Sequence, residues 1–200
     1  MKAPLVGLFV GGLGSRLGGA AKGNLENGAG ERVIERLIAA CREALGDSEL
    51  VLVGASDAYA ELGLPALPDT PAGVGPIGGL RALLLAAEAR GVPHVIALAC
   101  DLPYVGAPLI HRLATETLDA AFLAPRDGAF WQPLLARYET QAALAAVEAA
   151  LAHGEHALKS IAARLGESAR PLSIDEGERL ELRDCDSPAD LAAAGLRLPR

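Results

Sequence analysis

Short runs of apolar residues alternate along the chain with longer segments in which apolar residues recur every three or four positions. The short runs have the length of buried strands, and they predict strands at Leu5–Val10, Leu50–Val53, His94–Cys100, Ala120–Ala124 and Leu134–Tyr138. The longer segments have the period of an α-helix, and they predict helices at Glu31–Leu45, Gly78–Arg90, Pro108–Leu118, Gln141–Ala152, Ala157–Leu165 and Pro188–Ala194. Shorter stretches predict a helix at Asp57–Leu62 and strands at Leu172–Ile174 and Leu180–Leu182.

The predicted strands are almost continuously apolar, which indicates a sheet covered by helices on both faces. We therefore expect a Rossmann-like three-layer α/β sandwich with a mostly parallel sheet, folded as a single domain over residues 1–200. The proline-rich stretch Pro65–Pro76 is apolar on both sides, so we expect a loop at a ligand site there and not a linker between domains. In such sheets, ligands bind beyond the carboxyl ends of the strands.

Charge and cysteine content narrow the range of partners. The 200 residues carry 18 Lys and Arg against 25 Asp and Glu, a net charge of −7, which argues against broad binding to nucleic acid or to anionic membranes. No stretch has the roughly 20 apolar residues of a membrane span. The cysteines Cys41, Cys100 and Cys185 are widely spaced and odd in number, so neither a zinc site nor a disulfide framework is expected. These features predict a cytoplasmic protein.

A glycine-rich segment, Gly11–Asn27, follows the first predicted strand. Glycines let backbone N–H groups converge on a phosphate chain, and Arg16 and Lys22 add positive charge to a segment with no acidic residue before Glu26. The spacing differs from the dinucleotide fingerprint, because Leu17 stands at the third glycine position. It also differs from the P-loop, in which Ser or Thr follows the lysine. We expect a loop that binds a polyphosphate; a flexible loop of small residues is the alternative.

Two acidic residues are candidates for chemistry at this edge of the sheet. Asp101 follows an apolar central strand, and magnesium prefers one or two carboxylates together with substrate phosphates. The alternative for Asp101 is a turn residue before Pro103 or a cap of the next helix. Asp69 lies in the proline-rich loop before Gly78 and Gly79, where a helix begins and directs free N–H groups towards a ligand. The alternative for Asp69 is an exposed loop acid.

Further acids precede the last predicted helix. Ser187 suits the N-cap, Pro188 the first helical position, and Asp190 the position of a capping box. Because these residues already supply the cap, Asp186 is not needed for it and is a candidate for a functional role. The alternative is a solvated surface charge. Asp184 is a weaker candidate than Asp186.

The segment from Phe9 to Lys22 resembles the signature of nucleotidyltransferases, in which a glycine pair is followed by arginine, glycine and lysine. Within that class the chain most resembles the molybdenum cofactor guanylyltransferases. Four later segments match in the same order, namely Pro68-Asp69 with Gly75–Leu80, Ala99–Tyr104, Gln132–Tyr138 and Asp184–Leu191. The resemblance spans nearly the whole chain, and Gly75–Gly79 favours the guanylyl branch over the cytidylyl branch.

This resemblance implies the fold of the nucleotide-diphospho-sugar transferases. It also implies a reaction in which the phosphate of molybdopterin or molybdenum cofactor attacks the α-phosphorus of GTP and pyrophosphate leaves. It implies Mg²⁺ as cofactor on Asp101 and Asp186, catalysis by Arg16, Lys22 and Asp101, and molybdenum enzymes or their chaperones as transient partners. The residues implied to bind the nucleotide are Phe9, Val10, Gly11, Gly12, Gly14, Ser15, Lys22, Asp69, Gly78, Gly79 and Asp101.

Three positions depart from the family pattern. Ala21 replaces the Asp that usually precedes the lysine, Gly54 stands where an Asn often contacts the nucleotide, and Gln132 stands where some members have His. By resemblance, Gln132 and Pro133 lie near the pterin side.

The alternatives to a guanylyltransferase come from three classes. The nearest is a related nucleotidyltransferase that uses CTP on molybdopterin or another nucleotide on a different phosphorylated acceptor. The second is a nicotinamide oxidoreductase, which the failed fingerprint and the absence of an acid after the second strand disfavour. The third is a nucleotide-binding protein with a decayed site, which the departures at Ala21 and Gly54 motivate.

Overall fold

A computed structural model describes residues 2–11, 21–54, 57–185 and 187–199 of the chain. Its strands are β1 (Leu5–Phe9), β2 (Leu50–Val53), β3 (Ala66–Leu67), β4 (His94–Ala99), β5 (Phe122–Asp127), β6 (Phe130–Trp131), β7 (Leu135–Glu139) and β8 (Ala169–Leu172). Its α-helices are α1 (Val33–Leu45), α2 (Pro76–Ala89), α3 (Ala107–Thr115), α4 (Thr140–Ala152), α5 (Lys159–Leu165) and α6 (Pro188–Ala194). Short 3-10 helices lie at Lys22–Asn24, Asp57–Leu62, Gly166–Ser168 and Glu178–Leu180.

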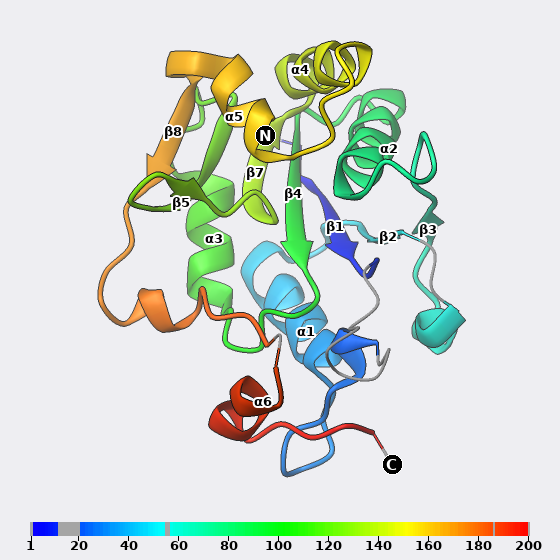
Figure 1. Cartoon of the computed structure of the whole chain (residues 1–200), viewed down its shortest axis with the longest axis vertical. Coiled ribbons are helices and arrows are strands. Elements are labelled where there is room, and N and C mark those ends of the chain that lie inside the picture. The colour runs from blue at the N-terminus through cyan, green and yellow to red at the C-terminus, as the bar shows by residue number, and fades with distance from the viewer. Residues whose placement is uncertain (1, 12–20, 55–56, 186, 200) are drawn as a thin grey trace.

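In the described part of the chain, the strands form one eight-stranded sheet of order β3-β2-β1-β4-β7-β5-β6, and β8 pairs with β5 (Figure 1). β1 runs parallel to both β2 and β4, and its last residue, Phe9, lies opposite Val53 and Ala99. β7 is antiparallel to its neighbours β4 and β5. The three central strands β2, β1 and β4 therefore end together at one edge of the sheet.

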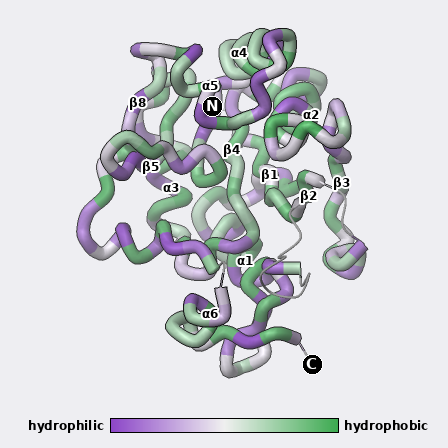
Figure 2. The backbone as a smooth tube through the Cα atoms, viewed as in Figure 1, coloured by the Kyte–Doolittle hydropathy of each residue, from purple (hydrophilic) through white to green (hydrophobic). Residues whose placement is uncertain are grey.

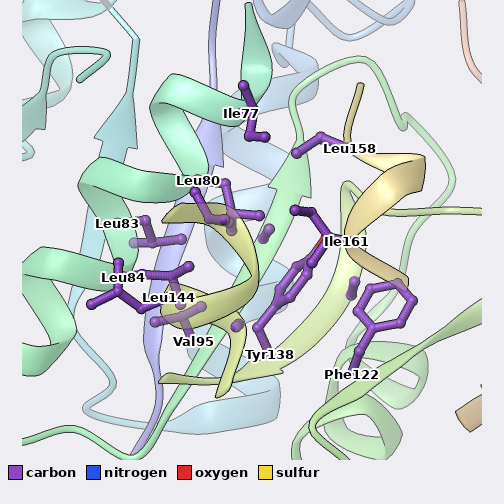
Figure 3. Packing of buried hydrophobic residues seen from close by; sticks show 14 of the residues in the cluster. Ile77, Leu80, Leu83, Leu84, Val95, Phe122, Tyr138, Leu144, Leu158 and Ile161 are labelled. Atoms are coloured by element: carbon purple, nitrogen blue, oxygen red, sulfur yellow. The ribbon is translucent and has the colours of Figure 1, made fainter. Parts of the chain in front are cut away.

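Helices cover both faces of the sheet, as the apolar strands predict. α2, α4 and α5 pack on one face, where Ile77, Leu144 and Ile161 belong to a single buried cluster (Figure 3). α1 and α3 pack on the other face with Val6 and Leu8 of β1. Figure 2 shows the resulting gathering of hydrophobic residues along the central strands. The three-layer α/β sandwich expected from the sequence is confirmed, and within the described ranges no helix combines the length and apolarity needed to cross a membrane.

Some local predictions are wrong. The strand expected at Leu180–Leu182 is absent, because the chain forms a 3-10 helix at Glu178–Leu180 and Leu180 is 51% exposed. Side chains favour this turn, since Asp175 Oδ1 accepts from the N–H of Glu178 and Glu178 Oε2 accepts from the N–H of Asp175. By contrast, the predicted capping box of the last helix is confirmed, with Ser187 and Asp190 in the expected places.

Arg137 of β7 is buried in the sheet, with 1% of its surface exposed. Its guanidinium donates hydrogen bonds to the backbone carbonyls of Leu113 at 2.9 Å, Glu116 at 2.7 Å and Thr117. These carbonyls lie at and beyond the last turn of α3, where a helix leaves its carbonyl groups without partners. Burial lowers the pKa of Arg137 from its ordinary value. The buried guanidinium of Arg137 therefore has a structural role, which is to cap the end of α3.

We expect Arg137→Met to lower the free energy of unfolding by about 2–4 kcal/mol, because it leaves several buried carbonyl groups without donors. Chemical denaturation with urea measures the change. The exposed Arg170 of β8 offers a matched control, and Arg170→Met should stay within about 0.5 kcal/mol of the unmodified protein. Equal stability of the two variants would contradict the capping role.

Candidate active site

A cavity of about 390 Å³, here called the central cavity, opens where the three central strands end. Its floor is formed by the last residues of β1, β2 and β4, namely Phe9, Val53 and Ala99. The other residues that line it are Gly11, Lys22, Asp69, Gly75, Pro76, Cys100, Asp101 and Leu134. This is the edge at which parallel sheets bind ligands.

Lys22 and Asp101 form an ion pair in the wall of the central cavity. The Nζ of Lys22 lies 2.8 Å from Oδ2 of Asp101, and the two side chains are 19% and 20% exposed. The chain around Asp101 is fixed on both sides, because Cys100 N–H donates to the carbonyl of Phe9 and Cys185 N–H donates to the carbonyl of Asp101. Among the described residues, Oδ1 of Asp101 has no hydrogen-bond partner, so this oxygen is available to a ligand.

Asp69 faces the central cavity from the proline-rich loop. Its carboxylate is half-buried, and desolvation raises the pKa of this group from its ordinary value. Within the described ranges it accepts no hydrogen bond. The first turn of α2 lies against it, since a Cβ at Gly78 would be 3.3 Å from Asp69 Cβ and one at Gly79 would be 3.0 Å from Asp69 Oδ1. The two glycines therefore let Asp69 approach the start of the helix.

The local backbone explains why glycine occupies position 54, one of the departures from the family pattern. Its φ is +97°, a conformation that favours glycine. A Cβ at this position would lie 3.1 Å from the backbone nitrogen of Gly11. The glycine therefore allows the chain after β2 to pass close to the chain after β1, where the central cavity begins.

A second cavity of about 470 Å³, here called the side cavity, adjoins the first. The two share Pro76, Ala99, Asp101 and Leu134. Besides Asp101, the polar side chains that line the side cavity are Gln132, His156, Lys159 and Asp184. The wall at Pro133 is held by Tyr138, whose hydroxyl donates to the Pro133 carbonyl at 2.7 Å. Asp101 thus stands at the boundary between two spaces, each large enough for part of a substrate.

The structure brings together many of the residues singled out from the sequence. Phe9, Gly11, Lys22, Asp69 and Asp101 line the central cavity. Val10 is buried beside it, with its N–H on the carbonyl of Val53, and Gly78 and Gly79 support Asp69 from α2. The residues Gly12, Gly14, Ser15, Arg16 and Asp186 lie outside the described residues.

Sequence reasoning did not find the contribution of His156 and Lys159. His156 lies in the connection that precedes α5, and Lys159 is the first residue of α5; the apolar pattern predicts this helix but does not indicate that its start lies at the candidate site. One available signal was the rarity of lysine, because the chain has only Lys2, Lys22 and Lys159. The number of lysines does not show that residue 159 lies near Asp101 in the folded chain.

The donor set at Asp101 fits a magnesium ion that arrives with a polyphosphate. Among the described residues, no group of three or more His, Cys, Asp and Glu side chains could hold a metal alone. Mg²⁺ in phosphate-transfer sites needs only one or two carboxylates, because phosphates and water complete its shell. Asp101 offers one carboxylate with an available oxygen at the cavity wall.

The fold and the two cavities define a nucleotidyltransferase-type site, and comparison with known proteins agrees. The family model of the MobA-like NTP transferase domain matches residues 7–169, and the chain belongs to this family. The molybdenum cofactor guanylyltransferase of Pseudomonas fluorescens (strain SBW25) is 36% identical over 163 residues, which cover 80% of this chain and 78% of that protein. The enzyme of the same name from Pseudomonas putida F1 is 35% identical over 192 residues, covering 92% and 93%.

One solved structure supports the same assignment, and a second shows the same fold. Molybdopterin-guanine dinucleotide biosynthesis protein A from Archaeoglobus fulgidus superposes with a TM-score of 0.73 at 26% identity, covering 95% of this chain and 96% of that one. The 2-C-methyl-D-erythritol 4-phosphate cytidylyltransferase of Thermus thermophilus shares the fold, with a TM-score of 0.67 at 17% identity over 97% of this chain and 98% of that one.

We expect Gly79→Ala to weaken nucleotide binding at least about tenfold. A Cβ there would lie 2.7 Å from Val53 Cγ1 and 3.0 Å from both Phe9 Cε1 and Asp69 Oδ1, so it would push cavity-lining side chains out of place. Overpacking of this kind also costs about 1–3 kcal/mol of stability. Calorimetric titration with a nucleoside triphosphate measures the affinity. Gly28→Ala is the control, because nothing lies within 4 Å of its Cβ position. Equal affinities would show that the close packing at Gly79 does not shape the site.

Proposed function

We propose that this protein transfers GMP from GTP to the terminal phosphate of molybdopterin or molybdenum cofactor, giving molybdopterin guanine dinucleotide and pyrophosphate. The observation that carries the proposal is the meeting of two cavities at Asp101, because a transferase must hold donor and acceptor on either side of the bond that forms. The names of the relatives, molybdenum cofactor guanylyltransferases, suggest which two substrates these are.

The central cavity has the features of a GTP site. Lys22 supplies a positive charge for the triphosphate, and the glycine-rich segment begins at Gly11 on the cavity wall. Asp69 supplies an acceptor for the base, because guanine carries N1–H and N2–H₂ donors on one edge and a carboxylate can accept both. The half-buried carboxylate of Asp69 has no partner within the described ranges, so a ligand that donates two hydrogen bonds would satisfy it.

The chemistry needs positioning and charge neutralisation more than proton transfer. The attacking phosphate oxygen is already ionised at neutral pH, so no general base is required. It forms a bond to the α-phosphorus of GTP, the bond from that phosphorus to the bridging oxygen breaks, and pyrophosphate leaves with the electron pair. Lys22 holds phosphate oxygens and stabilises the developing charge.

Magnesium would be held by Asp101, with Asp186 as a second carboxylate, and would neutralise charge on the phosphates. The available Oδ1 of Asp101 at the junction of the two cavities supports this role.

The side cavity would receive the pterin substrate. Gln132, His156 and Lys159 give it hydrogen-bonding groups and a positive charge, in keeping with a phosphorylated heterocycle. The three described cysteines form no disulfide with one another, as is usual in the reducing cytoplasm, where we place the reaction.

We expect Asp101→Asn to lower the rate of pyrophosphate release by about 10²–10³, since it keeps the side chain's shape and removes the charge that the proposal assigns to the metal. The assay combines GTP, molybdopterin and MgCl₂ with the purified protein. Asp47→Asn, at the exposed turn after α1, is the control and should keep full activity. A fully active Asp101→Asn enzyme would remove Asp101 from the mechanism.

The same assay with CTP in place of GTP tests the base. A higher rate with CTP would reject the proposed product and keep the transfer chemistry. Failure of the unmodified protein to release pyrophosphate from any nucleotide would favour a decayed binding protein.

We expect Lys159→Met to raise the KM for molybdopterin about tenfold and to leave the KM for GTP unchanged, because Lys159 lines the side cavity and not the central cavity. Initial rates over a range of each substrate measure both constants. Lys2→Met is the control, since Lys2 lies before β1 and contacts the Arg90 carbonyl, far from the carboxyl ends of the strands. A rise in the KM for GTP instead would show that the cavities are assigned the wrong way round.

A further inference from the structure

A buried tyrosine lies between the two chain segments that carry Lys22 and Asp101. Lys22 begins a 3-10 helix of three residues, and the residue before it, Ala21, provides no side-chain cap. A single helical turn is not stable by itself, because fixing its backbone costs more entropy than one hydrogen bond returns. The position of Lys22 therefore depends on contacts between this turn and other parts of the chain.

Tyr59, in the 3-10 helix Asp57–Leu62, provides such a contact. Its side chain is 0% exposed, and its Oη accepts a hydrogen bond from the backbone N–H of Gly23 at 2.9 Å. The same Oη lies 3.9 Å from the Sγ of Cys100, within reach of a weak hydrogen bond to sulfur. Gly23 follows Lys22 and Cys100 precedes Asp101. One hydroxyl thus contacts the direct neighbours of both members of the ion pair.

The backbone at Gly23 lies directly against this tyrosine. A Cβ at Gly23 would be 2.8 Å from Tyr59 Oη, 3.1 Å from Tyr59 Cε1 and 3.2 Å from the Cβ of Ile34. No side chain fits at this position without displacing the ring. The absence of a side chain at residue 23 is therefore what allows the hydrogen bond to form.

Neighbouring contacts hold the same two 3-10 helices together. Asn24 Nδ2 donates to the carbonyl of Ala58 at 3.0 Å, one residue away from each member of the Gly23–Tyr59 hydrogen bond. Arg32, the N-cap residue of α1, pairs with Glu61 in the second 3-10 helix. Tyr59 therefore belongs to an element that is packed against the turn that carries Lys22.

Burial shapes what the Tyr59 hydroxyl can do. Desolvation raises the pKa of this phenol above its ordinary value, so the group stays protonated at neutral pH. A neutral hydroxyl accepts from the N–H of Gly23 and forms a weak hydrogen bond with the Sγ of Cys100, in which either atom can be the donor. It is a fixed hydrogen-bonding group and not an acid or base for the reaction.

We propose that Tyr59 is a positioning residue of the transfer reaction: its hydroxyl holds the backbone of Lys22 and Gly23 against Cys100 and Asp101, and so sets how Lys22 Nζ meets the Asp101 carboxylate. The inference rests on the proposed function, in which Lys22 and Asp101 handle the phosphates. Tyr59 touches no substrate, since it does not line the central cavity. Its effect is transmitted through two backbone segments that are 36 and 41 residues away in sequence.

The first test is Tyr59→Phe, which keeps the ring in the core and removes only the hydroxyl. We expect kcat for pyrophosphate release to fall about tenfold to a hundredfold, because a small misplacement of Lys22 weakens transition-state stabilisation. The KM for molybdopterin should stay within about twofold, because the side cavity has no contact with this hydroxyl. Tyr104→Phe removes the same atom from a half-buried tyrosine whose hydroxyl has no partner among the described residues, and it should leave both constants unchanged.

The second test measures the positioning without activity. Amide hydrogen exchange, followed by mass spectrometry of peptides that contain Gly23, should be at least about tenfold faster in Tyr59→Phe and unchanged in Tyr104→Phe. Both variants should unfold cooperatively above the assay temperature, so that a loss of rate is not a loss of folded protein.

The outcomes separate the inference from the proposed function. If the unmodified protein releases no pyrophosphate, the proposed function is refuted, and so is the effect of Tyr59 on its rate. Faster amide exchange at Gly23 in Tyr59→Phe would still establish that the hydroxyl holds the Gly23 backbone. An active unmodified protein whose Tyr59→Phe variant keeps full kcat, or shows unchanged exchange, overturns the positioning role alone. A general fall in stability with unchanged kcat would make Tyr59 a core residue and nothing more.

Discussion

The parallel pairing of β1 with β4 is the constraint on which the site depends. Phe9 lies opposite Ala99 in this register, so the chains that leave the two strands, towards Gly11 and towards Asp101, emerge side by side at one edge of the sheet. Gly7, in the middle of β1, lets α2 close over the pair, because a Cβ there would lie 2.6 Å from Leu83 Cδ2. That close approach brings the start of α2 to the edge where the cavities open.

The sequence predicted the features that depend on local patterns. Apolar runs located the central strands, and Asp101 after one of them pointed to the edge of the sheet where the two cavities open. An apolar run carries no information about direction, so the antiparallel course of β7 was not predicted. Nor was the side cavity, because residues 132, 156 and 184 meet only after the chain has crossed the sheet and returned. The contacts of Tyr59 were not predicted for the same reason, since its partners lie 36 and 41 residues away in sequence.

The buried charge of Arg137 and the carboxylates of the candidate site differ in how fully they are hydrogen-bonded. Arg137 is fully buried, yet it points its charge at backbone carbonyls of α3 and has no place in either cavity at the carboxyl ends of the strands. Asp69 and Asp101 are less well satisfied, because each presents a carboxylate oxygen without a partner within the described ranges. Such groups cost stability in the free protein and repay it when a ligand donates to them. The fold tolerates this cost because its hydrophobic core is packed away from these carboxylates.

The Lys22–Asp101 pair explains how the proposed chemistry could coexist with a stable free protein. Two half-buried charges 2.8 Å apart neutralise one another, so neither is left uncompensated when the site is empty of substrate. In the proposed function, a nucleotide that brought its own cation would offer each side chain a new partner, phosphate oxygens for Lys22 and the cation for Asp101. The exchange would keep the charges matched. Because metal and nucleotide would act on the same ion pair, their affinities would also be coupled. The geometry of the pair then matters as much as its composition, and the buried hydroxyl of Tyr59, which contacts Gly23 and Cys100, contributes to that geometry.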